Sequence, residues 1–243
     1  MRVLRAQLAL GALLVAGPAL ASVGQVTALE GTAVRIPKAG GEQALASGAA
    51  IELEDTVRTA AGGFVKLVLT DGTALALGPD SELVLEVAEF AGQERSAFSA
   101  RLVLGRFWAR VKKAVAGCTT RFEVKSGRAV AGVRGTIFRL DATPLVAGSH
   151  PPKIRETLVR VLEGRVGVDA QVRRGKGKAP PPTAPGPRKE VAGPQEVSAD
   201  EWEKRFVELQ KNQQVAVGDT YFRTGSFDPK KKDALDRFLD KHP

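Results

Sequence analysis

Residues 63–87, GFVKLVLTDGTALALGPDSELVLEV, decide the fold class of this chain. Apolar residues alternate with other residues in three runs, at 65–69, 75–77 and 83–87. A period of two is typical of β-strands that bury one face. The pairs Asp71-Gly72 and Gly78-Pro79 lie between the runs, and such pairs form tight turns. The segment therefore predicts three short strands joined by turns.

The same pattern extends over residues 22–170, which we expect to form one β domain. Five of its strands open with a glycine, and successive glycines are 41, 33, 30 and 29 residues apart. A spacing near 30 favours a coiling architecture in which each rung stacks on the last. An ordinary sandwich remains the alternative, because its hairpins also start strands with glycine. The five glycines are Gly31, Gly72, Gly105, Gly135 and Gly164.

Residues 1–21 have the layout of a cleavable secretory signal peptide. Arg2 and Arg5 precede an apolar run at 8–15, and Ala19-Leu20-Ala21 supplies the small residues that signal peptidase requires. The run is shorter than the ~20 apolar residues that span a bilayer, which argues against an anchor helix. We therefore expect an exported protein with no transmembrane segment after cleavage.

The C-terminal quarter is expected to contain a linker and a helical tail. Residues 171–197 are rich in proline, glycine and basic residues, a composition typical of an extended spacer. Residues 198–243 are predicted to form two short α-helices, because Ser198–Glu201 resembles a capping box and Asp228-Pro229 a second helix start. Trp202 and Phe206 would share one face of the first helix. They would bind a partner or, alternatively, pack within the protein.

The composition argues against several classes of function. The chain has one cysteine, Cys118, and two histidines, His150 and His242, so it cannot form an internal disulfide and lacks a zinc ligand set. No phosphate-binding loop or dinucleotide fingerprint occurs. We expect no catalytic residues, no metal and no cofactor. The net charge is +9. In an exported protein this charge favours an anionic surface or polymer over nucleic acid, or simply aids solubility.

The β region contains a series of short motifs in a fixed order: 55–59 (DTVRT), 71–73 (DGT), 104–107 (LGRF), 133–138 (VRGTIF) and 161–166 (VLEGRV). With these motifs in this order, the segment 23–170 resembles the FecR domain. The resemblance implies a mainly β fold, a right-handed β-solenoid-like domain. It also implies a place in the Gram-negative envelope, in the periplasm or secreted, since FecR domains occur in periplasmic signalling proteins.

We expect the family-motif residues to be mainly structural. The glycines are expected where turns require positive φ or close backbone approach. Asp71 is expected to cap its own turn. Arg134 is expected to have a structural role, in which it pairs with a carboxylate or reaches backbone carbonyls across rungs, because buried arginines are usually paired. The motif residues are Asp71, Gly72, Gly105, Arg134, Gly135, Thr136, Phe138 and Gly164.

The sequence also differs from one group of FecR proteins. FecR proteins that regulate sigma factors carry a cytoplasmic helical segment and one membrane span, and this sequence shows neither. The leading hypothesis is an exported, non-enzymatic protein that binds an envelope protein or an anionic polymer through its β domain and tail. The alternative is a receptor-linked signalling component that acts with a separate membrane or sigma-factor regulator.

Overall fold

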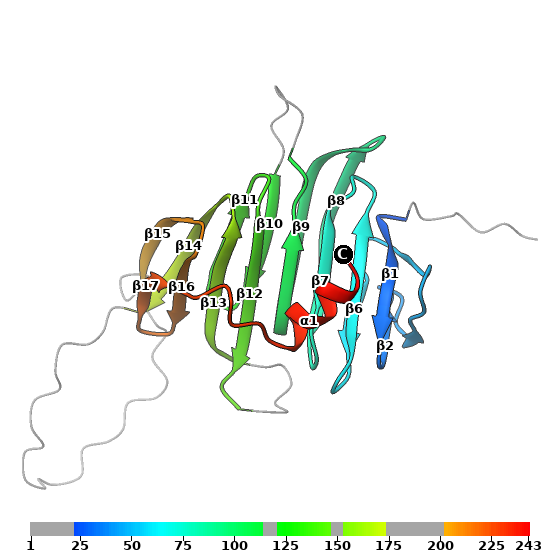
Figure 1. Cartoon of the computed structure of the whole chain (residues 1–243), viewed down its shortest axis with the longest axis horizontal. Helices are drawn as coiled ribbons and strands as arrows, with labels where there is room; N and C mark the ends of the chain where they lie inside the picture. Colours follow the sequence, from blue (N-terminus) through cyan, green and yellow to red (C-terminus); the bar gives the residue numbers. More distant parts are fainter. Residues whose placement is uncertain (1–21, 114–120, 147–152, 174–201) are drawn as a thin grey trace, which may run out of the picture.

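The computed structural model describes residues 22–113, 121–146, 153–173 and 202–243. These residues form a mainly β structure in which the strands follow one another along the long axis of the molecule (Figure 1). The elements are β1 Gly24–Glu30, β2 Ala33–Ile36, β3 Gln43–Ala44, β4 Ala50–Ile51, β5 Thr56–Thr59, β6 Phe64–Leu69, β7 Ala74–Leu77, β8 Glu82–Ala91, β9 Glu94–Arg110, β10 Arg121–Ser126, β11 Ala129–Val133, β12 Ile137–Pro144, β13 Ile154–Glu163, β14 Arg165–Arg173, β15 Trp202–Gln210, β16 Gln213–Gly218, β17 Phe222–Ser226 and α1 Ala234–Lys241.

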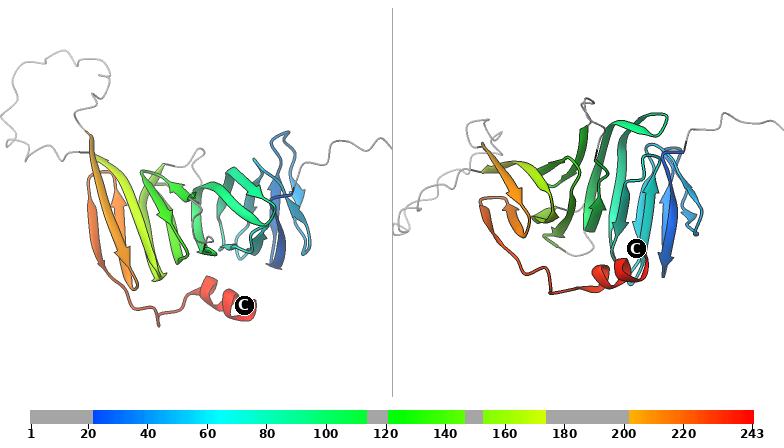
Figure 2. Two further views of the ribbon diagram at one scale, coloured as in Figure 1. Left: turned by 90° about the horizontal axis from the view of Figure 1, so that it is seen from above. Right: turned by 45° about the horizontal axis from the view of Figure 1, so that its top comes forward.

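Strand pairing divides the sheet into two layers. The first, the helix-side layer, has the order β4-β1-β6-β7-β9-β12-β13-β16-β17. The second, the open layer, has the order β3-β2-β5-β8-β9-β10-β11-β14-β15. Figure 2 shows α1 on one side of the strands, against the helix-side layer. Both layers contain β9, so the two are parts of one continuous sheet.

Strand β9 passes from one layer to the other at Gly105. Before this residue β9 pairs with β8 in the open layer, and from it onward β9 pairs with β12 in the helix-side layer. Gly105 has φ +94°, and a Cβ at this position would collide with Ser81. The Ser81 Oγ also accepts a hydrogen bond from the Arg106 amide at 2.8 Å. Only glycine fits this close approach, which fixes where the strand changes layer.

The hydrophobic core lies between the layers. Alternate residues of most strands point into it, as β14 shows with buried Val166, Val168 and Ala170 between exposed or half-buried neighbours. The Phe122 ring of the open layer meets the Phe138 ring of the helix-side layer edge-on, with centroids 6.4 Å apart. Phe138 is fully buried, in agreement with its place in the VRGTIF motif.

The mainly β prediction is confirmed, but the solenoid prediction is not. The strands pair antiparallel except β9 with β10, whereas stacked rungs of a coil would pair in parallel. The two-layer arrangement is closer to the sandwich alternative. All five recurrent glycines adopt positive φ. Four of them lie in turns just before a strand, whereas Gly105 lies within β9 where this strand changes layer. Their spacing therefore marks turns and the layer crossing rather than rungs.

The prediction of two tail helices is wrong, because the chain from Trp202 forms strands. All nine residues of β15 pair with β14, and β16 and β17 extend the helix-side layer. Trp202 and Phe206 have helical spacing, but the alternation of Val207 and Leu209 also suits a strand, and pairing with β14 decides between the two. The predicted signal peptide, Cys118, His150, most of the linker (174–197) and the capping box (198–201) lie outside the described residues.

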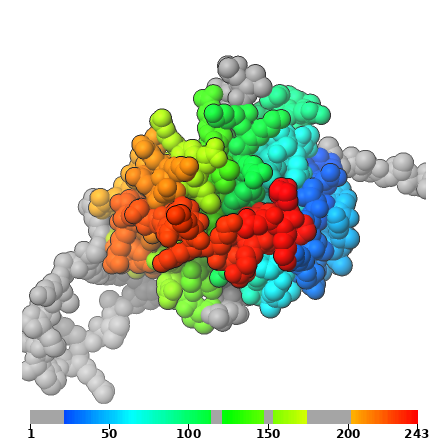
Figure 3. Space-filling view, viewed as in Figure 1, coloured from blue at the N-terminus to red at the C-terminus, as the bar shows by residue number. Residues whose placement is uncertain are grey.

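One helix, α1, forms in the tail, but it starts five residues after Asp228. Asp233 is its N-cap, and its side chain accepts a hydrogen bond from the Asp236 amide in a capping box. Asp228 instead accepts a bond from the Lys230 amide in a turn. The helix buries Leu235 and Phe238 on the outer face of the helix-side layer, and Phe238 stacks on Phe64 at 5.3 Å. Figure 3 shows the C-terminal segment crossing this face of the molecule.

Replacing Phe238 with alanine should release α1 from the sheet. The ring packs in a cluster with Ala74, Ala76 and Trp108, so its loss should lower the free energy of unfolding by up to about 3–5 kcal/mol. Urea unfolding measures the loss, and hydrogen exchange should show faster exchange at 234–241. Arg237→Ala, on the exposed side of α1, is the control. Wild-type protection of α1 in Phe238→Ala would contradict this packing.

Candidate functional site

The Asp71-Gly72-Thr73 turn forms a buried polar cluster with Arg95. The Asp71 carboxylate accepts a hydrogen bond from the Thr73 amide at 2.9 Å, as predicted for a residue that caps its own turn. Arg95 pairs with Asp71 and donates a hydrogen bond to Thr73 Oγ1 at 2.8 Å. Its guanidinium also lies 5.0 Å from the centre of the Phe122 ring. The cluster joins the β6–β7 turn to the start of β9.

No sequence motif pointed to Arg95, although only 4% of its surface is exposed. Burial lowers the pKa of its guanidinium, and the charges of Asp71 and Glu94 act in the opposite direction. Arg95 follows Glu94 just after the β8–β9 turn, a position typical of solvent-exposed arginines. A buried ion pair of this kind holds the structure together, and it has no surface with which to bind a partner.

The Arg134-Gly135-Thr136 motif is also structural. Gly135 and Gly164 both adopt positive φ, as predicted, and a Cβ on Gly164 would lie 3.0 Å from the Gly135 carbonyl oxygen. Thr136 Oγ1 donates a hydrogen bond to the Arg165 carbonyl at 2.8 Å, which joins the motif to the closing strand. Arg134 itself is exposed and forms no ion pair with any described residue, so neither its expected burial nor a carboxylate partner is found among these residues.

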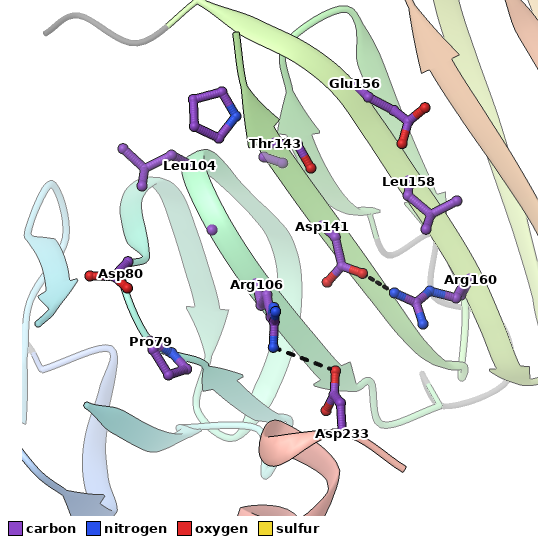
Figure 4. Close-up of a pocket in the computed structure, with 13 residues that line it drawn as sticks. Pro79, Asp80, Leu104, Arg106, Asp141, Thr143, Glu156, Leu158, Arg160 and Asp233 are labelled. Carbon is purple, nitrogen blue, oxygen red and sulfur yellow. Dashed lines mark hydrogen bonds and ion pairs between the residues drawn. The ribbon is translucent and has the colours of Figure 1, made fainter. Parts of the chain in front are cut away.

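A surface groove is the best candidate for a functional site. It lies on the outer face of the helix-side layer beside the N-terminus of α1, and we name it the sheet groove (Figure 4). Its volume is about 480 Å³. Its walls combine apolar side chains with charged ones. The lining residues are Pro79, Asp80, Leu104, Gly105, Arg106, Asp141, Ala142, Thr143, Pro144, Glu156, Leu158, Arg160 and Asp233.

Most charged side chains of the sheet groove are held by an opposite charge or a hydrogen bond. Asp141 pairs with Arg160, and Asp233 lies 3.8 Å from Arg106. Glu156 accepts a 2.5 Å hydrogen bond from the Tyr221 hydroxyl. Four carboxylates and two guanidiniums line the groove, so its formal charge is −2.

The N-terminus of α1 is fixed to the sheet next to this groove by Arg139. This arginine is 3% exposed, and its guanidinium bonds Asp233 at 2.6 Å and Asp236 at 2.9 Å. Burial alone would raise the pKa of Asp233, but the bond to Arg139 outweighs burial and holds that pKa well below its ordinary value. Asp233 therefore stays ionised down to strongly acidic pH.

Trp202 and Phe206 lie outside the sheet groove, on the outward face of edge strand β15. Phe206 is 65% exposed, and its ring lies over Gly167 of β14. The guanidiniums of Arg128 and Arg173 lie 4.2 and 5.4 Å from the centre of the Trp202 ring. Both side chains are accessible, as a partner-binding role requires. The two arginines around Trp202, however, belong to parts of the chain that are distant from Trp202 in sequence, so the sequence did not predict them.

Two general features of the described residues bear on the site. Among these residues, no helix has the length and apolar character needed to cross a membrane. The same residues contain no group of three or more histidine, cysteine or acidic side chains arranged to hold a metal ion. The His242 ring packs at a tilt against Phe238, with ring centroids 4.9 Å apart, and its Nε2 lies 3.3 Å from Glu30 Oε1, so His242 belongs to the packing of α1.

The buried ion pair between Arg95 and Asp71 predicts a large loss of stability when Arg95 is replaced. Arg95→Met should lower the free energy of unfolding by about 3–5 kcal/mol, because it leaves the Asp71 carboxylate buried without its partner. Arg101→Met is the matched control on the same strand. Arg101 is about half exposed and pairs with Glu86 at the surface, so its loss should cost less than about 1 kcal/mol. Equal losses in urea unfolding would contradict the structural role of Arg95.

The pairing of Asp233 predicts a pH dependence. Because its pKa is lower in the folded chain than in the unfolded one, Asp233 adds stability above about pH 4 that is lost as the pH falls. Asp233→Asn keeps a capping oxygen and removes the charge. The variant should be less stable than wild type at pH 7, and the difference should shrink toward pH 2 in urea unfolding. Asp228→Asn is the control, and a pH-independent difference for Asp233→Asn would contradict the ion pair.

Comparison with known proteins finds a family match for one segment of the chain. No curated protein matches the chain. Two crystal structures of a candidate anti-sigma factor from Parabacteroides distasonis ATCC 8503 align with TM-scores of 0.47 and 0.46 at 17% identity. Each alignment covers 72% of this chain and 61% of the other, so the chain spans less than two thirds of their length. Residues 55–167 match the family model described as FecR protein, and the chain therefore carries a FecR domain.

Proposed function

We propose that this protein is a non-enzymatic component of the bacterial envelope, periplasmic or secreted, that binds a segment of a partner protein in the sheet groove. The FecR domain supports a place in an envelope system. The signal-like composition of residues 1–21 supports export. The sheet groove supplies an accessible surface, to which the LGRF motif contributes Leu104, Gly105 and Arg106.

The charge of the sheet groove is the observation that carries this proposal. The whole chain has a net charge of +9, yet the groove has a formal charge of −2. An anionic polymer would be repelled from this surface, whereas a polypeptide segment with basic residues would be attracted. Apolar walls at Leu104 and Leu158 would bury the stems of such side chains. The groove therefore favours a protein over an anionic polymer as its occupant.

The same geometry supports recognition over catalysis. A general acid or base must exchange a proton near the working pH. The groove's carboxylates at Asp141 and Asp233 are paired with arginines, and the Glu156 carboxylate is held by Tyr221. Groups fixed in this way present a rigid pattern of charge, which lowers the cost of binding a matching segment.

The FecR domain also favours a second candidate function. In this case the protein would be a receptor-linked signalling component that acts with a separate membrane or sigma-factor regulator. The groove would then receive a segment of that regulator. Deletion of the gene should remove a transcriptional response to envelope or metal stress, measured by RNA sequencing. An unchanged transcriptome under both stresses would count against signalling.

Site-specific photo-crosslinking tests the groove. A photo-reactive residue in place of Thr143, which is exposed at the groove wall, should give one discrete adduct in envelope-intact cells. The control position is Gln171 on the outer face of the open layer, where no adduct is expected. Asp80→Asn should reduce the Thr143 adduct several-fold, because the charge is lost while asparagine tolerates the left-handed backbone of Asp80.

Asp169→Asn is the matched charge control, since Asp169 is exposed on the open layer. This variant should leave the Thr143 adduct unchanged, and mass spectrometry of the adduct identifies the partner. Adducts of equal yield at Thr143 and Gln171, or none at Thr143, would refute binding in the groove.

A further inference from the structure

A second recess lies at the rim of the molecule, where strand ends of both layers meet. We name it the rim recess, and its volume is about 640 Å³. The open layer contributes the β10–β11 turn and the end of β14. The helix-side layer contributes the ends of β12 and β13 and the turn between β16 and β17. The described residues that line it are Gly127, Arg128, Leu145, Lys153, Ile154, Arg155, Arg173, Asp219, Thr220 and Tyr221.

The charge of the rim recess is opposite to that of the sheet groove. Four cationic side chains and one carboxylate line it, which gives a formal charge of +3. The carboxylate, Asp219, accepts a 2.9 Å hydrogen bond from Arg128 Nε. Within the described part of the chain, Lys153, Arg155 and Arg173 form no ion pair with a carboxylate. Three cations therefore face one small recess without a counter-charge from these residues.

Specific contacts hold the arginines and the walls of the rim recess in place. Trp202 lies beneath the guanidiniums of Arg128 and Arg173, at 4.2 and 5.4 Å, and such stacking restricts a planar guanidinium. The Arg173 amide donates a 2.7 Å hydrogen bond to the Asp219 carbonyl, which ties the end of β14 to the β16–β17 turn. The Tyr221 hydroxyl is fixed by Glu156 at the opposite wall. Two arginines are thus positioned before any ligand arrives.

We propose that the rim recess binds a phosphate group, either free or carried on a lipid. A guanidinium fork presents parallel N–H donors that match the oxygens of phosphate. Phosphate carries close to two negative charges in one compact group. Three cations without a counter-charge therefore favour a phosphate ligand over a ligand with a single carboxylate. Trp202 is a positioning residue here, because it holds the arginines and leaves their donors to the ligand.

Binding measurements on the full chain test the proposal with two phosphate sources. Isothermal titration calorimetry uses inorganic phosphate and pyrophosphate, and co-sedimentation uses phosphatidylcholine vesicles with and without phosphatidic acid. The double variant Arg155→Gln with Arg173→Gln should weaken binding at least about tenfold, since it removes two charged donor groups. The matched control is Arg134→Gln with Arg237→Gln, which removes the same charge from exposed arginines without ion pairs among the described residues.

Substitutions of Trp202 test whether binding depends on the positioning of the arginines and not only on net charge. Trp202→Leu should weaken binding several-fold at unchanged net charge, and Trp202→Phe should restore most of it because an aromatic face remains. Thermal unfolding confirms that each variant is folded. These substitutions lie outside the sheet groove, so their effects are separable from crosslinking at Thr143.

Each outcome decides the proposal. Binding of phosphate or pyrophosphate that the recess pair loses and the control pair keeps supports a free ligand. The same pattern with vesicles alone supports a lipid headgroup. The phosphate site would be overturned by a lack of binding to both the soluble phosphates and the vesicles, or by equal weakening in both arginine pairs. Binding only to polyglutamate, a carboxylate polymer without phosphate, would also overturn it.

Discussion

The passage of β9 between the two layers is the constraint on which the rest of the structure depends. This strand pairs with β8 and β10 in the open layer and with β7 and β12 in the helix-side layer. A shift of one residue in β9 would turn core side chains outward in both layers at once. Gly105 and Ser81 fix the crossing point, because their backbones approach too closely for any side chain at 105. The buried Arg95 pair then locks the start of the same strand.

The C-terminal helix shows how the layers produce a surface. Residues after β17 return along the molecule, and Lys66 Nζ on β6 donates hydrogen bonds to the backbone oxygens of His242 and Pro243 at 2.6 and 2.7 Å. The helix covers an apolar part of the outer face, including Trp108, that would otherwise contact water. The sheet groove lies on the same face beside the N-terminus of the helix. The tail therefore both protects the sheet and bounds the site.

The net charge of +9 is distributed unevenly, and this distribution matters more than the total. The groove has a formal charge of −2 and the rim recess one of +3, although both lie among the same strands. A cationic chain with an acidic groove can distinguish a basic protein segment from an anionic group and bind each at its own surface. The two proposed sites are chemically complementary. The LGRF motif contributes Leu104, Gly105 and Arg106 to the sheet groove, whereas no residue of the named family motifs lines the rim recess.

The sequence alone determined the mainly β character, the FecR assignment, the positive φ of the motif glycines and the turn that Asp71 caps. The alternation of apolar residues and the positive φ of glycines are local properties, so both can be predicted from the sequence. Only the tertiary structure decided that Trp202 begins a strand, that Arg95 is buried and that Arg134 is exposed. It alone assembled both candidate sites, joining Arg106 to Asp233 and Arg128 to Trp202. These depend on contacts between residues far apart in the chain, and pairing of β15 with β14 outweighs the weak local preference for a helix.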